Sequence, residues 1–88
     1  MMFVILSYDV AEKRVGKMSK IAKKYLVPVQ RSLYNGYLTN SQIEKLKREL
    51  SEHIDASRDK IVIYKISDTN VMIVDNIGPM KAVEDFII

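Results

Sequence analysis

The chain has 88 residues, of which 48% are hydrophobic and 28% charged, and its formal net charge is +3. This length suits one small domain and excludes a second one. Because the sequence contains no cysteine, disulfides, zinc–thiolate centres and thiol nucleophiles are excluded as well.

The elements expected in the N-terminal half follow from hydrophobic periodicity. Residues 3–8 are apolar and partly β-branched, which is typical of a buried strand. This run is too short for a membrane span and has no basic leader, so we expect a cytoplasmic protein without membrane contact. Between residues 11 and 25 apolar side chains recur at the spacing of an amphipathic helix. Residues 26–34 are expected to be extended, with Pro28 at a sheet edge, and Asn35-Gly36 is typical of a type I′ turn between two strands.

A second helix and further strands are expected after this hairpin. Ser41 and Glu44 have the spacing of a capping box at the start of the helix. Its inner face is expected to hold four apolar residues, Ile43, Leu46, Leu50 and Ile54. Residues 60–66 and 71–75 are expected to be strands joined by a polar turn at 67–70, and residues 84–88 are a candidate for a last short strand.

The order of these elements predicts a ferredoxin-like βαββαβ fold of the α+β class with an additional C-terminal strand. We expect a single domain over residues 1–88, with its core in residues 1–75 and a C-terminal segment, residues 76–88, that is used in dimerisation. Both faces of the sheet carry apolar side chains, but two helices can cover only one of them. We therefore predict a homodimer that packs sheet to sheet or exchanges C-terminal strands.

The positive charge is concentrated in the first part of the chain. Residues 1–34 carry seven basic and two acidic side chains, whereas residues 35–88 carry seven basic and nine acidic ones. Such asymmetry in a small domain favours a polyanionic partner, although lysines on a solvated helix face are its ordinary structural explanation. Charge alone leaves both interpretations open.

Asp9 stands where the first strand gives way to the basic helix. Its structural interpretation is a helix N-cap, a role that Asp often fills. Its functional interpretation is a ligand of a hard cation, Mg²⁺ with Mn²⁺ as the alternative, because Mg²⁺ needs only one or two carboxylates besides water and phosphate oxygens. Two copies of Asp9 near a twofold axis would supply two carboxylates to one metal ion.

Several basic, aromatic and polar residues are candidates for contact with a nucleic acid. Five basic residues would contact a phosphate backbone, Arg14, Lys17, Lys20, Lys24 and Arg31. Tyr8 and Tyr34 are candidates for stacking on bases or orienting water, although an aromatic residue in a strand is more often part of the core. Gln30 and Ser32 share one side of their strand and could bond a phosphate or a neighbouring strand.

The remaining titratable residues receive structural interpretations. The single histidine, His53, lies near the end of the second helix, where its charge would favour the helix dipole. Asp55 and Asp59 flank a loop and are expected to be turn or capping residues. A solvated helix face is the expected place of three glutamates, Glu44, Glu49 and Glu52.

The sequence resembles the CRISPR-associated family called Cas two over most of its length, to about residue 75. The resemblance is carried by SYDV at residues 7–10, Arg14 in the basic helix, VQRSLYNGYLT at 29–39 and IDASRDKIVIYKI at 54–66. It implies a ferredoxin-like homodimer, a metal ion between the two aspartates that match Asp9, and metal-dependent cleavage of RNA or DNA. It also implies a partnership with the CRISPR-associated integrase in the acquisition of new spacers.

By position, the resemblance makes Asp9 the Mg²⁺ ligand and a catalytic residue together with Tyr8. It makes Arg14 and Arg31 phosphate contacts and places three residues beside the site, Gln30, Ser32 and Tyr34. Two other functions stay open. One is a structural DNA-binding adaptor of the spacer-integration complex in which Asp9 has no catalytic role. The other is a toxin-like ribonuclease of the same fold, which forms no stable complex with an integrase.

Overall fold

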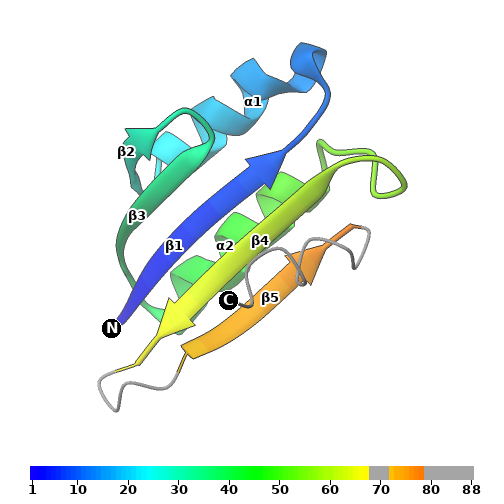
Figure 1. Ribbon diagram of the computed structural model, residues 1–88. Coiled ribbons are helices and arrows are strands. Elements are labelled where there is room, and N and C mark those ends of the chain that lie inside the picture. Colours follow the sequence, from blue (N-terminus) through cyan, green and yellow to red (C-terminus); the bar gives the residue numbers. More distant parts are fainter. Residues whose placement is uncertain (68–71, 79–88) are drawn as a thin grey trace.

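The computed structural model describes residues 1–67 and 72–78, which form one antiparallel sheet with both helices on the same face (Figure 1). The elements are, in chain order, β1 (Met2–Asp9), α1 (Glu12–Lys23), β2 (Val27–Gln30), β3 (Leu33–Leu38), α2 (Asn40–Ser51), β4 (Lys60–Ile66) and β5 (Met72–Ile77). Across the sheet the strands run β2-β3-β1-β4-β5. The ferredoxin-like fold with an additional strand after β4 is therefore confirmed.

Parts of the C-terminal predictions lie outside the described residues. The proposed turn at 67–70 is described only at Ser67, and the candidate strand at 84–88 is not described. The strand expected at 71–75 is β5, which continues to Ile77. Neither helix in the described part of the chain is long and apolar enough to span a membrane.

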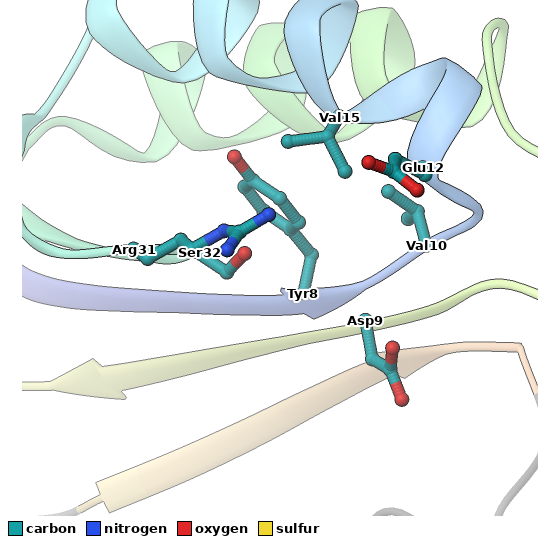
Figure 2. Close-up of a pocket in the computed structure, with 7 residues that line it drawn as sticks. All are labelled: Tyr8, Asp9, Val10, Glu12, Val15, Arg31 and Ser32. Carbon is teal, nitrogen blue, oxygen red and sulfur yellow. The ribbon is translucent and has the colours of Figure 1, made fainter.

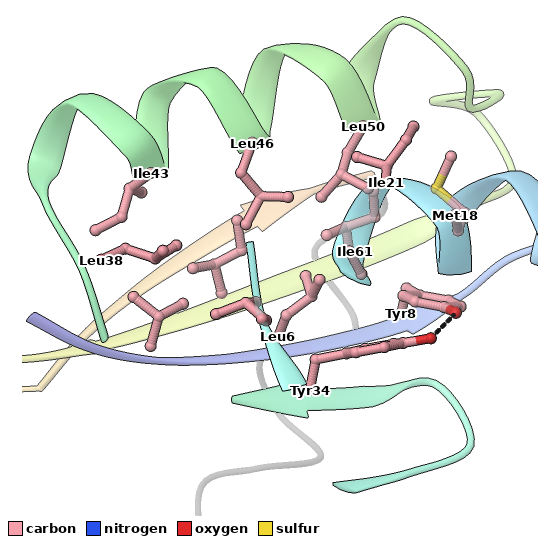
Figure 3. Close-up of a cluster of buried hydrophobic side chains, with 14 residues drawn as sticks. Leu6, Tyr8, Met18, Ile21, Tyr34, Leu38, Ile43, Leu46, Leu50 and Ile61 are labelled. Carbon is pink, nitrogen blue, oxygen red and sulfur yellow. Dashed lines mark hydrogen bonds between the residues drawn. The ribbon is translucent and has the colours of Figure 1, made fainter. Parts of the chain in front are cut away.

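The core lies between the helices and the sheet (Figure 3). Side chains alternate along β1, so that Val4, Leu6 and Tyr8 point toward the helices and are buried. They pack with residues of the other elements that are also buried, including Met18, Ile43, Leu46, Leu50, Ile61 and Ile63. The same alternation turns Asp9, the next residue after Tyr8, to the opposite face of the sheet.

The face of the sheet that α1 and α2 do not cover, here called the helix-free face, also carries apolar side chains. Phe3 and Ile5 of β1 lie on it, and Phe3 is paired with Tyr37 of β3. The two rings are 5.1 Å apart, and Tyr37 is 66% exposed. The expectation of apolar residues on both faces thus holds in the described strands, while the homodimer stays a prediction.

The predicted turn at Asn35-Gly36 is wrong. Both residues lie inside β3, where Asn35 is paired with Ile5 and Gly36 with Val4. The chain turns instead at Ser32, whose φ of 62° is in the left-handed region. A Cβ on Gly36 would lie 3.1 Å from a methyl carbon of Leu26, so this glycine serves close packing rather than a turn. The expectation that Pro28 lies at a sheet edge is confirmed, because β2 is an edge strand.

The predicted capping box is displaced by two residues. The N-cap of α2 is Thr39, whose hydroxyl accepts a hydrogen bond from the Gln42 N–H at 3.2 Å, while the Gln42 side chain accepts one from the Thr39 N–H at 2.9 Å. This pair has the same spacing as Ser41 and Glu44. It forms the capping box because the helix begins at Asn40, which makes Thr39 the N-cap. The predicted buried face of α2 is confirmed at three positions, Ile43, Leu46 and Leu50.

Candidate metal and nucleic-acid site

Asp9 ends β1 with an exposed side chain on the helix-free face. Figure 2 shows it pointing away from Tyr8 and from the helices. Its neighbour in the β1–β4 ladder is Lys60. Among the described residues no basic side chain forms an ion pair with the Asp9 carboxylate. This carboxylate could therefore supply a ligand to a cation.

The structure does not support a capping role for Asp9. The N-cap of α1 is Ala11, whose own side chain makes no capping hydrogen bond. The first turn is closed by a hydrogen bond of 2.8 Å from the Arg14 N–H to the Ala11 carbonyl. Asp9 lies two residues before this N-cap, where its side chain faces the other side of the sheet.

One chain brings too few ligands to this position for a complete metal site. Within residues 1–67 and 72–78 no three acidic, histidine or cysteine side chains gather into a group that could hold a metal ion. A hard cation at Asp9 would thus need further ligands from water, from a substrate phosphate or from another chain.

A cavity of about 310 Å³ lies beside Asp9, between the start of α1 and the β2–β3 turn (Figure 2). The turn is joined to the end of β1 by a hydrogen bond of 3.2 Å from the Tyr8 N–H to the Ser32 carbonyl. The cavity is lined by Tyr8, Asp9, Val10, Glu12, Val15, Arg31 and Ser32. The fold thus brings three predicted site residues together, Tyr8, Arg31 and Ser32, while Asp9 borders the cavity and directs its carboxylate to the helix-free face (Figure 2).

Three lining residues were missed by the sequence interpretation, Val10, Glu12 and Val15. Their closeness to Asp9 along the chain was the available signal. Gln30 is exposed at the end of β2 and does not line the cavity.

Tyr8 and Tyr34 belong to the core. They are 6% and 4% exposed, and their stacked rings lie 5.9 Å apart. Their hydroxyl oxygens are 3.3 Å apart, and the Tyr34 hydroxyl also donates a hydrogen bond of 2.9 Å to Ser19 Oγ. Burial, followed by the contact with Tyr34, raises the pKa of the Tyr8 phenol well above its ordinary value. Neither ring has a free face on which a base could stack.

Arg14, expected to contact phosphate, is engaged by Asp59. The Arg14 Nε donates to Asp59 Oδ2 at 2.5 Å and its Nη2 donates to Oδ1 at 3.0 Å. The side chains are 19% and 2% exposed. The Arg14 guanidinium thus forms a largely buried ion pair with an acid 45 residues further along the chain, and its contact with phosphate stays a prediction.

The other predicted phosphate contacts are exposed. Lys17 and Lys20 lie on the outer side of α1, and Arg31 lies in the β2–β3 turn. Lys24 also faces solvent, but its Nζ is 2.5 Å from an oxygen of Glu49 on α2. Glu49 also accepts a hydrogen bond of 2.8 Å from the Tyr25 hydroxyl. Among the predicted phosphate contacts, Lys17, Lys20 and Arg31 thus carry free positive charge more than Lys24 does.

Comparison with known proteins gives consistent matches. The sequence model of the family described as CRISPR associated protein Cas2 matches residues 2–73. The CRISPR-associated endoribonuclease Cas2 of Thermotoga maritima is 43% identical over 86 residues, which cover 98% of this chain and 99% of that protein. The protein of the same name from Methanosarcina acetivorans is 35% identical over 81 residues, covering 92% and 93% of the two chains.

Solved structures agree with these matches. A crystal structure described as that of cas2 is 34% identical with a TM-score of 0.70, and the match covers 73% of this chain and 72% of that chain. The crystal structure of Streptococcus pyogenes Cas2 at pH 6.5 is 29% identical with a TM-score of 0.67, and the match covers 72% and 83%. Sequence and backbone therefore point to the same set of relatives.

Proposed function

Because the chain belongs to the CRISPR-associated protein Cas2 family, we propose that it is a metal-dependent endonuclease that cleaves phosphodiester bonds of RNA or DNA and acts with the CRISPR-associated integrase in the acquisition of new spacers. Relatives named endoribonucleases support the nuclease activity and favour RNA as the first substrate to test. The observation that carries the proposal is the carboxylate of Asp9, which is exposed on the helix-free face and forms no ion pair with a basic side chain of the described residues.

Asp9 would hold Mg²⁺, or Mn²⁺, in a site shared by two copies of the chain. Its exposed carboxylate oxygens are the donors that Mg²⁺ prefers, and one such ligand suffices when water and phosphate complete the shell. When bound, the ion would neutralise charge on the phosphate and lower the pKa of a coordinated water molecule. The donor set of one chain fits part of such a site, since no group of three acidic, histidine or cysteine side chains forms in the described part of the chain.

A homodimer is supported by the character of the helix-free face. Phe3 and Tyr37 form an aromatic pair on this face, and Tyr37 is largely exposed. Asp9 lies at the end of a strand on the same face. Two copies that join these faces would bury the apolar side chains and bring their Asp9 residues to a common interface.

The basic side chains would bind the nucleic acid backbone. Arg31 stands at the cavity beside Asp9, and Lys17 and Lys20 extend the positive surface along α1. Contacts of this kind recognise phosphates, so they give binding with little sequence preference and strong salt dependence. The substrate is thus defined by its backbone rather than by a base sequence.

Replacement of Asp9 by Asn tests the nuclease proposal. D9N keeps the size of the side chain and removes its charge, so cleavage of RNA and DNA oligonucleotides with Mg²⁺ should fall by about two orders of magnitude. Binding of the same oligonucleotides should stay within about twofold, because the basic residues are unchanged. E52Q, an acid-to-amide change at an exposed position after α2, is the matched control. Full cleavage by D9N would contradict the proposal.

The adaptor function is the second candidate, and a specific observation favours it. The hydroxyl of Tyr8 is buried and bonded to Tyr34, which leaves Asp9 as the single free side chain of the predicted catalytic pair. If D9N no longer cleaves but still supports spacer integration with the integrase, the adaptor role is the biological one. If the chain cleaves RNA and does not co-purify with an integrase, the toxin-like ribonuclease is favoured instead.

A further inference from the structure

A buried carboxylate ties the segment after Asp9 to the rest of the fold. Asp59, at the end of the α2–β4 connection, is 1% exposed and is the buried charged residue among those described. Its Oδ1 accepts hydrogen bonds of 3.0 Å from the Ala11 N–H and from Arg14 Nη2. Its Oδ2 accepts from Arg14 Nε at 2.5 Å and from the Asp55 N–H at 2.9 Å. Both oxygens are thus fully used.

The contacts of Asp59 involve both the residues that follow Asp9 in the chain and the strand that lies beside Asp9. Ala11 lies two residues after Asp9, and its carbonyl closes the first turn of α1 with the Arg14 N–H. Asp59 directly precedes Lys60, which is the neighbour of Asp9 in the β1–β4 ladder. One carboxylate therefore fixes both the segment that leaves Asp9 and the start of the strand that lies beside it.

The backbone of Asp59 also lies close to the residue that follows β5. Gly78, at the end of β5, has a φ of 108°, and a Cβ built on it would lie 2.1 Å from the Asp59 carbonyl oxygen. Only glycine can approach this closely in such a conformation. Asp59 is thus packed between the segment after β1, the start of β4 and the end of β5.

Stability alone does not account for this arrangement. Buried ion pairs often contribute little net stability, because the desolvation of both charges offsets their attraction. They do fix geometry, since a guanidinium and a carboxylate that share two hydrogen bonds have one preferred orientation. Because the Arg14–Asp59 pair lies next to Asp9, the candidate metal ligand, its fixed geometry can orient that ligand.

We propose that Asp59, through Arg14 and the Ala11 N–H, is a positioning residue that holds Asp9 in place for metal binding and phosphodiester cleavage. This inference rests on the proposed function. A ligand that shifts by about 1 Å can cost about two orders of magnitude in rate, so a rigid support behind Asp9 has a direct effect on chemistry.

The test uses D59N in the full chain. The amide keeps the shape of the carboxylate but removes its charge and half of its capacity to accept hydrogen bonds from Arg14. We expect kcat for oligonucleotide cleavage to fall about 10- to 100-fold and the Mg²⁺ concentration for half-maximal rate to rise about tenfold, as for residues that support metal ligands. The KM for the oligonucleotide should stay within about twofold, because the phosphate-binding residues are unchanged.

E49Q is the matched control. It weakens the ion pair of 2.5 Å between Lys24, which directly follows α1, and Glu49 on α2 by the same loss of an acidic charge. This pair lies at the far end of α1, so the Mg²⁺ dependence of E49Q should be that of the unchanged chain. R14K is a milder second variant that keeps the charge and loses the two-bond geometry, and we expect an intermediate effect.

A readout without catalysis separates this inference from the proposed function. Amide hydrogen exchange in residues 10–14 should be about tenfold faster in D59N and unchanged in E49Q. If D59N and E49Q lower the melting temperature alike and neither changes the Mg²⁺ dependence or this exchange, Asp59 is merely structural and the inference is overturned. If the unchanged chain cleaves nothing, the proposed function fails, and equal exchange in the two variants would overturn the inference independently.

Discussion

The hydroxyl oxygens of Tyr8 and Tyr34 lie 3.3 Å apart in the core (Figure 3), and the Tyr8 side chain lies on the side of β1 opposite to Asp9 (Figure 2). This contact fixes the orientation of the last residues of β1, because a buried Tyr8 leaves its neighbour Asp9 on the helix-free face. The Tyr34 hydroxyl in turn donates a hydrogen bond to Ser19 on α1. Tyr8 thus connects the candidate site to the core by packing and hydrogen bonding.

Replacement of Tyr8 by Phe should therefore affect stability more than cleavage. Y8F removes one buried hydroxyl and leaves the Tyr34–Ser19 hydrogen bond of 2.9 Å in place, so the free energy of unfolding should fall by about 1 kcal/mol. Urea unfolding measures this loss. Cleavage by Y8F should stay within about threefold of the unchanged chain; a loss of about two orders of magnitude would instead make Tyr8 a catalytic residue, as the family resemblance implies.

Acid should destabilise the protein through Asp59. The Arg14 guanidinium lowers the pKa of the Asp59 carboxyl from 3.8 to about 2 in the folded chain. The folded state therefore favours the charged form, so this contribution to stability is complete above pH 3.8 and is lost as the pH falls toward 2. By linkage it amounts to about 2 kcal/mol.

Unfolding of the unchanged chain and of D59N between pH 2 and 6 measures this effect. Three other carboxyls also have lowered pKa values, Glu49, Asp55 and Asp75. They titrate in both proteins, so their contributions to the unfolding free energy cancel in the difference between the two. We expect the difference in unfolding free energy to shrink as the pH falls below about 4. A difference that does not depend on pH would mean that the Asp59 pKa is not lowered in the folded chain.

Hydrophobic spacing was enough to predict the fold. The helices could be read from the sequence because Met18, Ile43 and Leu46 recur with the helical period on faces that the structure buries. The turn at Asn35-Gly36 could not, since a dipeptide preference is local while the pairing of Gly36 with Val4 is set by the whole sheet. Ser32 adopts the left-handed conformation instead, and no turn dipeptide in the sequence indicated this position.

The candidate site could be predicted only in part. Asp9 was identifiable because it directly follows an apolar strand, and alternation then decides its face. The ion pair of Arg14 could not be predicted, because a pattern of basic residues does not distinguish a solvated cation from one whose acidic partner lies 45 residues away. For the same reason Asp59 was assigned to a turn, although it also anchors the first turn of α1.

Gly16 in α1 and Gly78, which directly follows β5, should respond in opposite ways to replacement by Ala. Gly16 is exposed in α1, and a Cβ there would meet no atom within 4 Å, so G16A should stabilise the fold by about 0.5 to 1 kcal/mol. Gly78 has a positive φ and no room for a Cβ, so G78A should destabilise by at least about 1 kcal/mol. Thermal unfolding of both variants checks the pair, and a destabilising G16A would contradict the free space seen at α1.

The salt dependence of nucleic-acid binding should distinguish the free basic residues from the paired one. Lys17, Lys20 and Arg31 are exposed, so replacing any of them by Gln should lower the slope of log K against log salt by up to about 1 for duplex DNA. K24Q should lower it less, because the Lys24 Nζ is already 2.5 Å from a Glu49 oxygen. Titrations at several salt concentrations measure each slope.

K45Q is the control for these variants, since it removes an exposed positive charge from α2 rather than from α1 or the β2–β3 turn. Its slope should equal that of the unchanged chain if the phosphates follow α1 and Arg31. If K45Q lowers the slope as much as K17Q does, the attraction comes from the net charge of +3 and not from a defined surface. We expect the reduction of the slope to be largest for K17Q, smaller for K24Q and absent for K45Q. This order tests where the nucleic acid backbone lies as well as whether it binds.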